Sequence, residues 1–536
     1  MKGRHLLSGR RRGGGAFSGF SVPAAYRAVM VTLLAIGLSV ESFAQDGSVD
    51  QAASAPSVGR RGVTIVPRVT VTEILTDNAN LSNTAKQADL VTEVIPGIRV
   101  TSDFGRVKGY FDYSLNGRVS AQGVSGTSLQ NNLTAFGSLE AVENFAFLDV
   151  NASITQQSVS GLGTQSSGSY FSNANQTETS TYRISPYLKG SVGGYADFET
   201  RYGFAFTRSA SSVASDVTTK DLLLSLKGQP SASRIGWSLQ AVQQATSYSL
   251  GRATESDSLT GSLSYALNPQ LVVSASAGQE GNNYNTLEKE RNWTNGQGIQ
   301  WSPSPSTSFS ASRQTRPFGQ SHNINLSYRT ARSAWSFTDS QDVSNSPSQS
   351  SLGSLGPIYD LYFTQFATVE PDPVKRAVLV NTFLQVNGIN PNTIVVSNFL
   401  TSALSLQRRQ DLSFTLLGIR SSVTFTATRT ETSRLDTITN AIDDLSNSNS
   451  IRQTGLSVSY AHRLTPDTSM NVTGMNQRSS DSSGIQETVT NSVNLGVSTR
   501  LGLKSTAAIN ARRVVFDNRT SPYIETAITG TVTVQF

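Results

Sequence analysis

The sequence of 536 residues contains no cysteine, which excludes disulfide-stabilised folds and cysteine-ligated zinc or iron–sulfur sites. Only 15% of the residues are charged, whereas an ordinary soluble protein has about one quarter. No uninterrupted apolar run reaches the roughly 18 residues that a transmembrane helix needs. A highly charged disordered chain and a multi-span helical membrane protein are therefore both disfavoured.

The first 44 residues carry most of the excess positive charge. The formal net charge is +6, and this segment holds six basic residues against Glu41 alone. A basic start, an apolar run from Ala28 to Val40 and small residues at Ser42 and Ala44 predict a secretory signal peptide over residues 1–44. The rest of the chain is almost neutral, so no nucleic-acid partner is expected.

The chain after the leader alternates between apolar and polar residues. Small polar residues at 45–62 predict a flexible linker. From Val63 onward, segments separated by Gly, Asn, Ser and Asp place apolar side chains at every second position. Residues 107–119, 197–207, 493–504 and the end of the chain show this pattern best. Period two puts the two sets on opposite faces of a strand.

Alternation alone fits two architectures. In a soluble sandwich or solenoid the apolar face packs inward, whereas in an outer-membrane barrel it faces lipid. The signal peptide, strands of about 9–11 residues, and polar positions filled by Ser, Thr, Asn, Gln and charges of both signs favour the barrel. We therefore expect an all-β fold, a transmembrane antiparallel β-barrel over 63–536 with an even number of strands, about 16–22, and one helical insertion.

A barrel assigns the polar face to the lumen. The candidate lumen-lining residues are Lys108, Asp112, Arg118, Asp197, Glu199, Arg201, Arg329, Arg500 and Lys504. The chain ends in an aromatic residue after an alternating apolar series, the pattern that barrel-assembly machinery reads; its residues are Ile528, Val532, Val534 and Phe536. Candidates for the aromatic girdles at the membrane surfaces, with ordinary packing as the alternative, are Trp237, Trp301, Trp335, Tyr460 and Tyr523.

The alternation of apolar and polar residues stops in an insertion at 343–397. A polar linker precedes a helix signal that starts at Asp372 and Pro373 and stops at Gly388 and Pro391. The spacing predicts a helix of about 14 residues. This insertion either plugs or gates the lumen, or it is a loop that rests on one rim of the barrel.

No catalytic, cofactor or metal motif is present. Phosphate loops, HExxH and GxSxG are all absent. Beyond the leader the histidines are His322 and His462, both in polar-rich strands, where a surface or lumen position is expected. Asp443 and Asp444 are expected in a solvated loop at a strand end, with calcium binding as a minor alternative. We therefore predict a non-enzymatic protein without a cofactor or bound metal.

Three blocks of the sequence resemble a known family. They are RVTVTEILTDNANLS…KQADLVTEVIPGIRV, YDLYFTQFATVEPDPVKRAVLVNTFLQVNGINP and VVSNFLTSALSLQRRQDLSFTLLGIRSSVTFTATRT. The mature chain is similar to the outer-membrane proteins associated with the PEP-CTERM/exosortase system, most strongly at 68–101 and 357–430. This resemblance implies a Gram-negative outer-membrane barrel encoded with exopolysaccharide synthesis and protein-sorting machinery. The family offers no catalytic residues to carry over.

Two functions from different classes remain open. The first is a conduit or assembly component for extracellular polysaccharide export, selective by bore and wall charge. The alternative is an outer-membrane enzyme or structural anchor that acts on surface polymer. The partners expected are outer-membrane lipid, the barrel-assembly machinery, and exopolysaccharide with its export proteins. An autotransporter translocator fits poorly, because no passenger domain precedes the first strands.

Overall fold

The computed structural model describes most of the chain from residue 62 to residue 536. Within that range it leaves out 125, 167–172, 212–213, 229–233, 402–403, 436–442 and all of 345–398 except Phe363, Phe366, Arg376 and Val380. The predicted signal peptide at 1–44 and nearly all of the linker at 45–62 lie outside the described residues. So does nearly all of the insertion at 343–397, although Arg376 and Val380 are helical as the sequence predicts.

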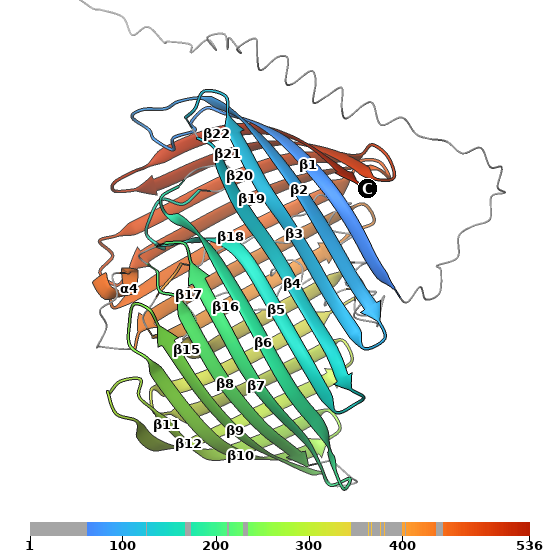
Figure 1. Cartoon of the computed structure of the whole chain (residues 1–536), viewed down its shortest axis with the longest axis vertical. Coiled ribbons are helices and arrows are strands. Elements are labelled where there is room, and N and C mark those ends of the chain that lie inside the picture. The colour runs from blue at the N-terminus through green and yellow to red at the C-terminus, as the bar shows by residue number, and fades with distance from the viewer. Residues whose placement is uncertain are drawn as a thin grey trace, which may run out of the picture. The chain divides into compact units, whose positions relative to one another are not determined.

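The described residues form 22 strands and one short helix (Figure 1). The strands are β1 (Val63–Thr76), β2 (Asp89–Phe104), β3 (Val107–Ser120), β4 (Ser128–Val142), β5 (Ala146–Ser158), β6 (Gln176–Val192), β7 (Ala196–Ser209), β8 (Val217–Gly228), β9 (Ile235–Tyr248), β10 (Thr254–Asn268), β11 (Leu271–Asn282), β12 (Glu290–Ser304), β13 (Thr307–Arg316), β14 (Gly319–Arg329), β15 (Ser333–Ser344), β16 (Ser405–Leu417), β17 (Ser421–Arg434), β18 (Ser450–Arg463), β19 (Thr468–Asp481), β20 (Glu487–Arg500), β21 (Ser505–Asn518) and β22 (Tyr523–Gln535). The helix is α4 (Asp444–Asn447).

The sheet closes on itself. Each strand pairs antiparallel with the next one in sequence, and β1 pairs with β22 from Arg68↔Gln535 to Thr76↔Ala527. Closure leaves no sheet edge, which matters because an unpaired backbone group in lipid costs several kcal/mol. The prediction of an all-β antiparallel barrel is confirmed, with the strand number at the upper limit of the expected range.

The two ends of the barrel differ in their connections. At one end, the short-turn end, the strands are joined by tight turns such as that from Phe104 to Val107, where Gly105 has a φ of +53°. The chain reaches β1 and leaves β22 at this end. At the other, the long-loop end, lie the long connections β1–β2, β5–β6, β15–β16 and β17–β18, the last of which contains α4. No helix among the described residues is long and apolar enough to cross a membrane.

The strand register separates an inner wall from an outer wall. The connection from β5 to β6 reaches Tyr523 of β22, whose hydroxyl donates to the carbonyl of Gln165 at 2.5 Å. A connection can reach across the ring only on its interior side, so the face that carries Tyr523, Thr531 and Thr533 is the inner wall. The opposite face carries large exposed apolar side chains such as Val458 and Leu495. An exposed apolar outer wall around a polar interior is the arrangement of a barrel in lipid.

Candidate functional site: the inner wall and its mouth

The inner wall is lined mainly by hydroxyl and amide side chains. Across the closing seam, the Thr70 and Thr533 hydroxyls lie 2.9 Å apart, and those of Thr72 and Thr531 lie 3.2 Å apart. On β17, every second residue from Thr424 to Thr432 is a buried threonine on the inner wall. This wall offers both donors and acceptors, and its chemistry is that of hydrogen bonding to polar, uncharged solutes.

The structure places the candidate lumen residues as follows. Strand register puts on the inner wall Lys108, Asp112, Arg118, Asp197, Glu199, Arg201, Arg329 and Arg500. Lys504 differs, because β20 ends at Arg500 and residues 501–504 form a turn at the short-turn end. The apolar-polar pattern runs on through Leu501 and Leu503, which made the strand seem longer in the sequence than it is in the structure.

Asp112 is the centre of one inner-wall ion cluster. Its carboxylate accepts hydrogen bonds from Arg68 at 2.5 Å, from Arg99 at 2.8 Å and from the Tyr110 hydroxyl at 3.1 Å. These three partners come from β1, β2 and β3. The sequence singled out Asp112 but neither arginine, although both fall on the inner face of their strands.

A second inner-wall cluster surrounds Arg201. Its guanidinium donates to Asp149 at 2.8 Å and to Glu199 at 3.0 Å, and lies 3.9 Å from the centre of the Tyr187 ring. Nearby, Arg183 and Asp221 form a further pair at 2.7 Å. The charges on the inner wall are thus largely paired, and the wall carries both signs rather than one selecting field.

The long-loop end of the barrel is bridged from inside by a contact that we call the mouth clasp, formed by Ser160, Gly161 and Asp444. The Ser160 hydroxyl donates to both carboxylate oxygens of Asp444, at 2.8 and 2.9 Å, and the Gly161 amide donates at 2.7 Å. Ser160 follows β5, whereas Asp444 lies between β17 and β18, half the ring away. The mouth clasp therefore joins opposite sides of the barrel.

Backbone and apolar contacts reinforce this bridge. The Leu400 amide donates to the Ser158 carbonyl at 3.0 Å, which pairs the end of β5 with the segment that precedes β16. Phe399, Leu445 and Ile451 are fully buried together, with Leu162 packed against them. A Cβ on Gly161 would meet the Phe399 ring at 3.1 Å, a tight contact that the absence of a side chain at this position avoids.

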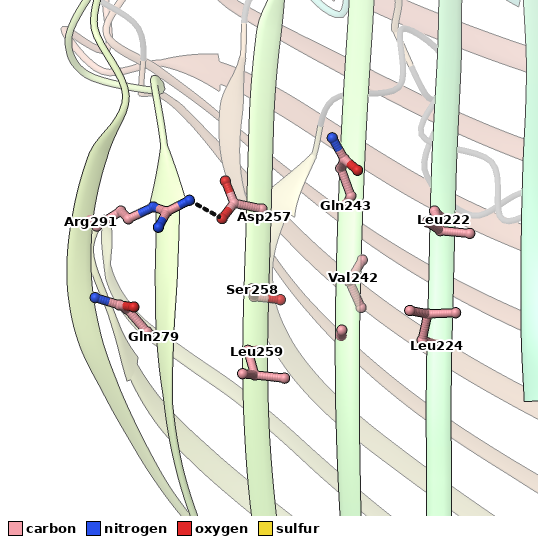
Figure 2. A pocket seen from close by; sticks show the side chains of 10 residues that line it. Leu222, Leu224, Val242, Gln243, Asp257, Ser258, Leu259, Gln279 and Arg291 are labelled. Carbon is pink, nitrogen blue, oxygen red and sulfur yellow. Dashed lines mark hydrogen bonds and ion pairs between the residues drawn. The ribbon is translucent and has the colours of Figure 1, made fainter. Parts of the chain in front are cut away.

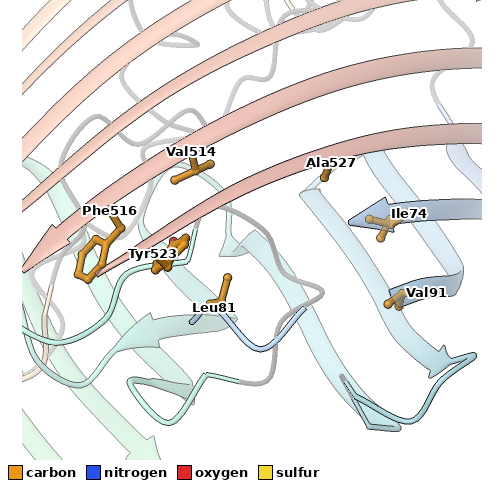
Figure 3. Close-up of a cluster of buried hydrophobic side chains, with 7 residues drawn as sticks. All are labelled: Ile74, Leu81, Val91, Val514, Phe516, Tyr523 and Ala527. Atoms are coloured by element: carbon orange, nitrogen blue, oxygen red, sulfur yellow. The ribbon is translucent and has the colours of Figure 1, made fainter. Parts of the chain in front are cut away.

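An apolar cluster closes the inner wall beside the seam at the same end. Figure 3 shows its members, from β1, β2, β21, β22 and the β1–β2 connection. They are Ile74, Leu81, Val91, Val514, Phe516, Tyr523 and Ala527. These side chains are buried although they lie on the otherwise polar inner wall, so alternation in the sequence gives no signal for them.

Two expectations about single residues are corrected here. Tyr523 is not a girdle residue, because it is fully buried on the inner wall and stacks on Phe516. Asp443 and Asp444 are not in a solvated loop. Asp443 caps α4 by accepting from the Ser446 amide, and burial raises the pKa of the Asp444 carboxyl above its ordinary 3.8.

Among the described residues, no group of three or more His, Asp or Glu side chains forms a metal site.

The other girdle candidates lie on the outer wall toward the short-turn end. Trp237, Trp301, Trp335 and Tyr460 are each at least one third exposed. Trp335 packs on Phe414 with ring centres 4.1 Å apart. Ile528, Val532 and Val534 of the C-terminal series also face outward, and the exposed Phe536 donates its amide to the Pro67 carbonyl at 2.9 Å.

Both histidines also lie on the outer wall. His322 Nε2 is 3.0 Å from Asp339, which Arg408 also contacts. His462 Nδ1 is 2.8 Å from the Ser421 hydroxyl. Within the described part of the chain no carboxylate is hydrogen-bonded to His462, so this serine–histidine pair lacks the acid that orients a catalytic histidine. A polymer inside the lumen would not reach either histidine.

One pocket lies on the outer wall at β8–β12 and has a volume of about 360 Å³. Figure 2 shows Leu222 and Leu224 at the right, Gln279 and Arg291 at the left, and Gln243, Leu259 and Asp257, which pairs with Arg291, between them. The pair is joined at 3.3 Å. The pocket therefore marks a place where the apolar outer wall becomes polar.

The apolar outer wall, the polar inner wall and the closed ring define a membrane-spanning β-barrel of the outer-membrane type. No family model matches the sequence, and no curated protein matches it. Among solved structures, the chain is similar to the FrpB iron transporter from Neisseria meningitidis (F5-1 variant), with 9% identity over 89% of this chain and 83% of that one, at a TM-score of 0.49.

Two further structures illustrate the range. The siderophore receptor PirA from Pseudomonas aeruginosa is 9% identical over 88% of this chain and 80% of that one, at a TM-score of 0.41. OccK2 (OpdF) from the same organism is 8% identical over 88% of this chain and 98% of that one, at a TM-score of 0.33. These likenesses concern the barrel fold alone.

Proposed function

We propose that this protein is an outer-membrane conduit or assembly component for the export of extracellular polysaccharide, acting beside a PEP-CTERM/exosortase system. The observation that carries the proposal is the hydroxyl- and amide-rich inner wall of a closed barrel. Sugar hydroxyls exchange hydrogen bonds readily with Ser, Thr, Asn and Gln, and paired charges neither trap nor repel a neutral chain. The blocks at 68–101 and 357–430 supply the link to the export system.

The mouth clasp suggests how such a conduit is kept closed at rest. Asp444 and Ser160 join opposite sides of the long-loop end, which in outer-membrane barrels faces the cell exterior. A barrel held shut in this way leaks little solute between export events. The helical insertion at 343–397 is a second candidate for closure, as a plug or as a loop at the rim.

The proposal also includes a route to the membrane. The signal peptide at 1–44 directs the chain across the inner membrane, and barrel-assembly machinery reads the outward-facing series that ends at Phe536. No catalytic role is proposed, because the Ser421–His462 pair is remote from the lumen.

A bilayer experiment and a secretion experiment test this function together. The purified chain in planar bilayers is expected to conduct little, and deletion of 343–397 is expected to raise the conductance. Unchanged conductance after the deletion would remove the plug. A strain that lacks the protein is expected to retain its polymer inside the cell, with export restored by the wild-type chain; normal export without the protein would refute the conduit.

A further inference from the structure

A group of outward-facing arginines lies near the long-loop end of β13 and β16–β19. We call this group the arginine border; its members are Arg313, Arg408, Arg429, Arg452 and Arg478. Register places Arg408 opposite Glu431, which is opposite Arg452. One step closer to the short-turn end, Arg429 and Arg478 flank Thr454. The four arginines of β16–β19 thus occupy two adjacent rows on four neighbouring strands.

The next row toward the short-turn end is apolar from β15 to β18 and continues to the polar Asn476 on β19. It contains Phe337, Leu412, Ala427 and Leu456, each two residues along its strand from the row that holds Arg429. Two residues of a strand span about 7 Å. The outer wall therefore passes from hydrocarbon-like to charged within one such step, as expected where acyl chains end and lipid headgroups begin.

The arginines keep hydrogen-bonding capacity after their protein contacts are counted. Arg408 pairs with Asp339 at 2.8 Å, Arg452 with Glu431 at 3.4 Å, and Arg478 with Glu487 at 2.6 Å. The side chains of the four arginines on β16–β19 remain between 46% and 59% exposed. Each guanidinium has five N–H donors, and the five arginines outnumber the three carboxylates, so donors and positive charge are left over for a ligand.

Outward-facing arginines also lie near the long-loop end at Arg208 of β7 and Arg291 of β12, but they are densest on β16–β19, with one on each of four adjacent strands. At the long-loop end of β1–β4, the outer wall instead exposes Leu75, Val119 and Leu129. Single arginines such as Arg208 solvate the rim one at a time, whereas those of β16–β19 are close enough to act on one ligand. Their clustering on adjacent strands, directly above an apolar row, indicates a local binding surface for an amphiphile.

We propose that the arginine border binds the phosphate groups of a phosphate-bearing lipid in the outer leaflet of the membrane. Guanidinium groups bind phosphate oxygens through paired, charge-assisted hydrogen bonds, which explains arginine rather than lysine at these positions. The acyl chains of the lipid lie along Leu412, Ala427 and Leu456. This site is independent of the conduit, because it lies on the outer wall and shares no residue with the lumen.

The test uses the full mature chain in detergent micelles, with bisphosphorylated lipid A as the probe and native mass spectrometry as the readout. A basic residue beside an anionic lipid surface contributes about 1 kcal/mol, roughly fivefold in affinity. The triple variant Arg408→Gln, Arg429→Gln and Arg452→Gln is expected to weaken binding about a hundredfold. The single variant Arg429→Gln, expected to lose about fivefold, serves if the triple variant does not show heat-modifiable folding.

The matched control is Arg409→Gln, one residue from Arg408 but on the inner wall beside Asp411. It is expected to bind lipid A like the wild type, and an equal loss there would overturn the proposal. Dephosphorylated lipid A is expected to bind weakly; tight binding would overturn the role of phosphate. Displacement of lipid A by inorganic phosphate or by an acidic polysaccharide at equal concentration would overturn the lipid assignment. Conductance is expected to be the same in the triple variant and the wild type. Lipid binding and conductance are therefore independent readouts, and a failure of the lipid proposal can be told apart from a failure of the conduit proposal.

Discussion

Replacing Asp444 with alanine is expected to open the mouth of the barrel. The substitution removes the acceptor of hydrogen bonds from the Ser160 hydroxyl and the Gly161 amide. A partly buried donor left without a partner costs about 1–3 kcal/mol, and relief of the buried charge offsets part of this cost. A net loss of about 2 kcal/mol raises the population of the open mouth roughly thirtyfold.

Hydrogen exchange at the Gly161 amide measures this opening directly. Exchange is expected to accelerate by about the same thirtyfold factor, while amides in the middle of β18 keep their protection. The control is Asp517→Ala, at an exposed position on the outer wall. It is expected to change neither the exchange rate of the Gly161 amide nor the protection of the β18 amides. Unaltered exchange at Gly161 in Asp444→Ala would show that the mouth clasp does not hold the β5–β6 connection.

The pH dependence of the mouth clasp follows from the same carboxyl group. Burial raises the pKa of Asp444 above 3.8, so the closed mouth binds its proton more tightly than the open mouth does. The stabilisation that this proton provides is complete below 3.8 and is lost as the pH rises through the raised pKa. The protection of the Gly161 amide, measured as its exchange rate relative to an unstructured peptide at the same pH, is therefore expected to increase on acidification, and Asp444→Asn is expected to abolish this increase. A pH profile of Asp444→Asn identical to that of the wild type would contradict the assignment.

Two further outcomes are expected. Arg201→Gln leaves Asp149 and Glu199 without their shared cation on the inner wall, and one added negative charge about 7 Å from the ion path changes the cation-to-anion permeability ratio about sevenfold in water. Reversal potentials in a salt gradient measure the ratio, and an unchanged value would show that ions avoid this wall. Deletion of Phe536 is expected to reduce the folded, heat-modifiable protein in the outer membrane several-fold while leaving refolding in detergent intact; Gln535→Ala is the control, and equal membrane yields would refute an assembly signal at Phe536.

The sequence alone predicted the barrel because alternation is a local property. Strands such as β3 and β7 place apolar and polar residues on separate faces at every step, and no distant contact is needed to read them. The strand number was less accessible, since short strands such as β13 and β14 resemble polar loops. Lys504 was misplaced for the related reason that alternation continues past the end of β20.

The mouth and the arginine border were beyond prediction for different reasons. Ser160 and Asp444 are separated by 284 residues, and only the closed ring brings them together. Buried Phe516 and Tyr523 lie on the inner face, where alternation predicts polar residues, so the sequence pattern gives no sign that they pack together. The arginines of β16–β19 share their outward face with lipid-facing leucines, so their common row is visible only once the register is known.

The seam between β1 and β22 has a consequence for the order of events in the life of the chain. β1 is matched to β2 along its whole length, from Val63↔Ser102 to Thr76↔Asp89, but to β22 only from Arg68 onward. The pairing of β1 with β22 thus joins the two strands that lie farthest apart in the sequence, and β22 is synthesised after the other strands of the ring. Until β22 has been synthesised, one edge of β1 has no partner strand in the ring, and a chain that ends before β22 lacks the strand that closes the cylinder.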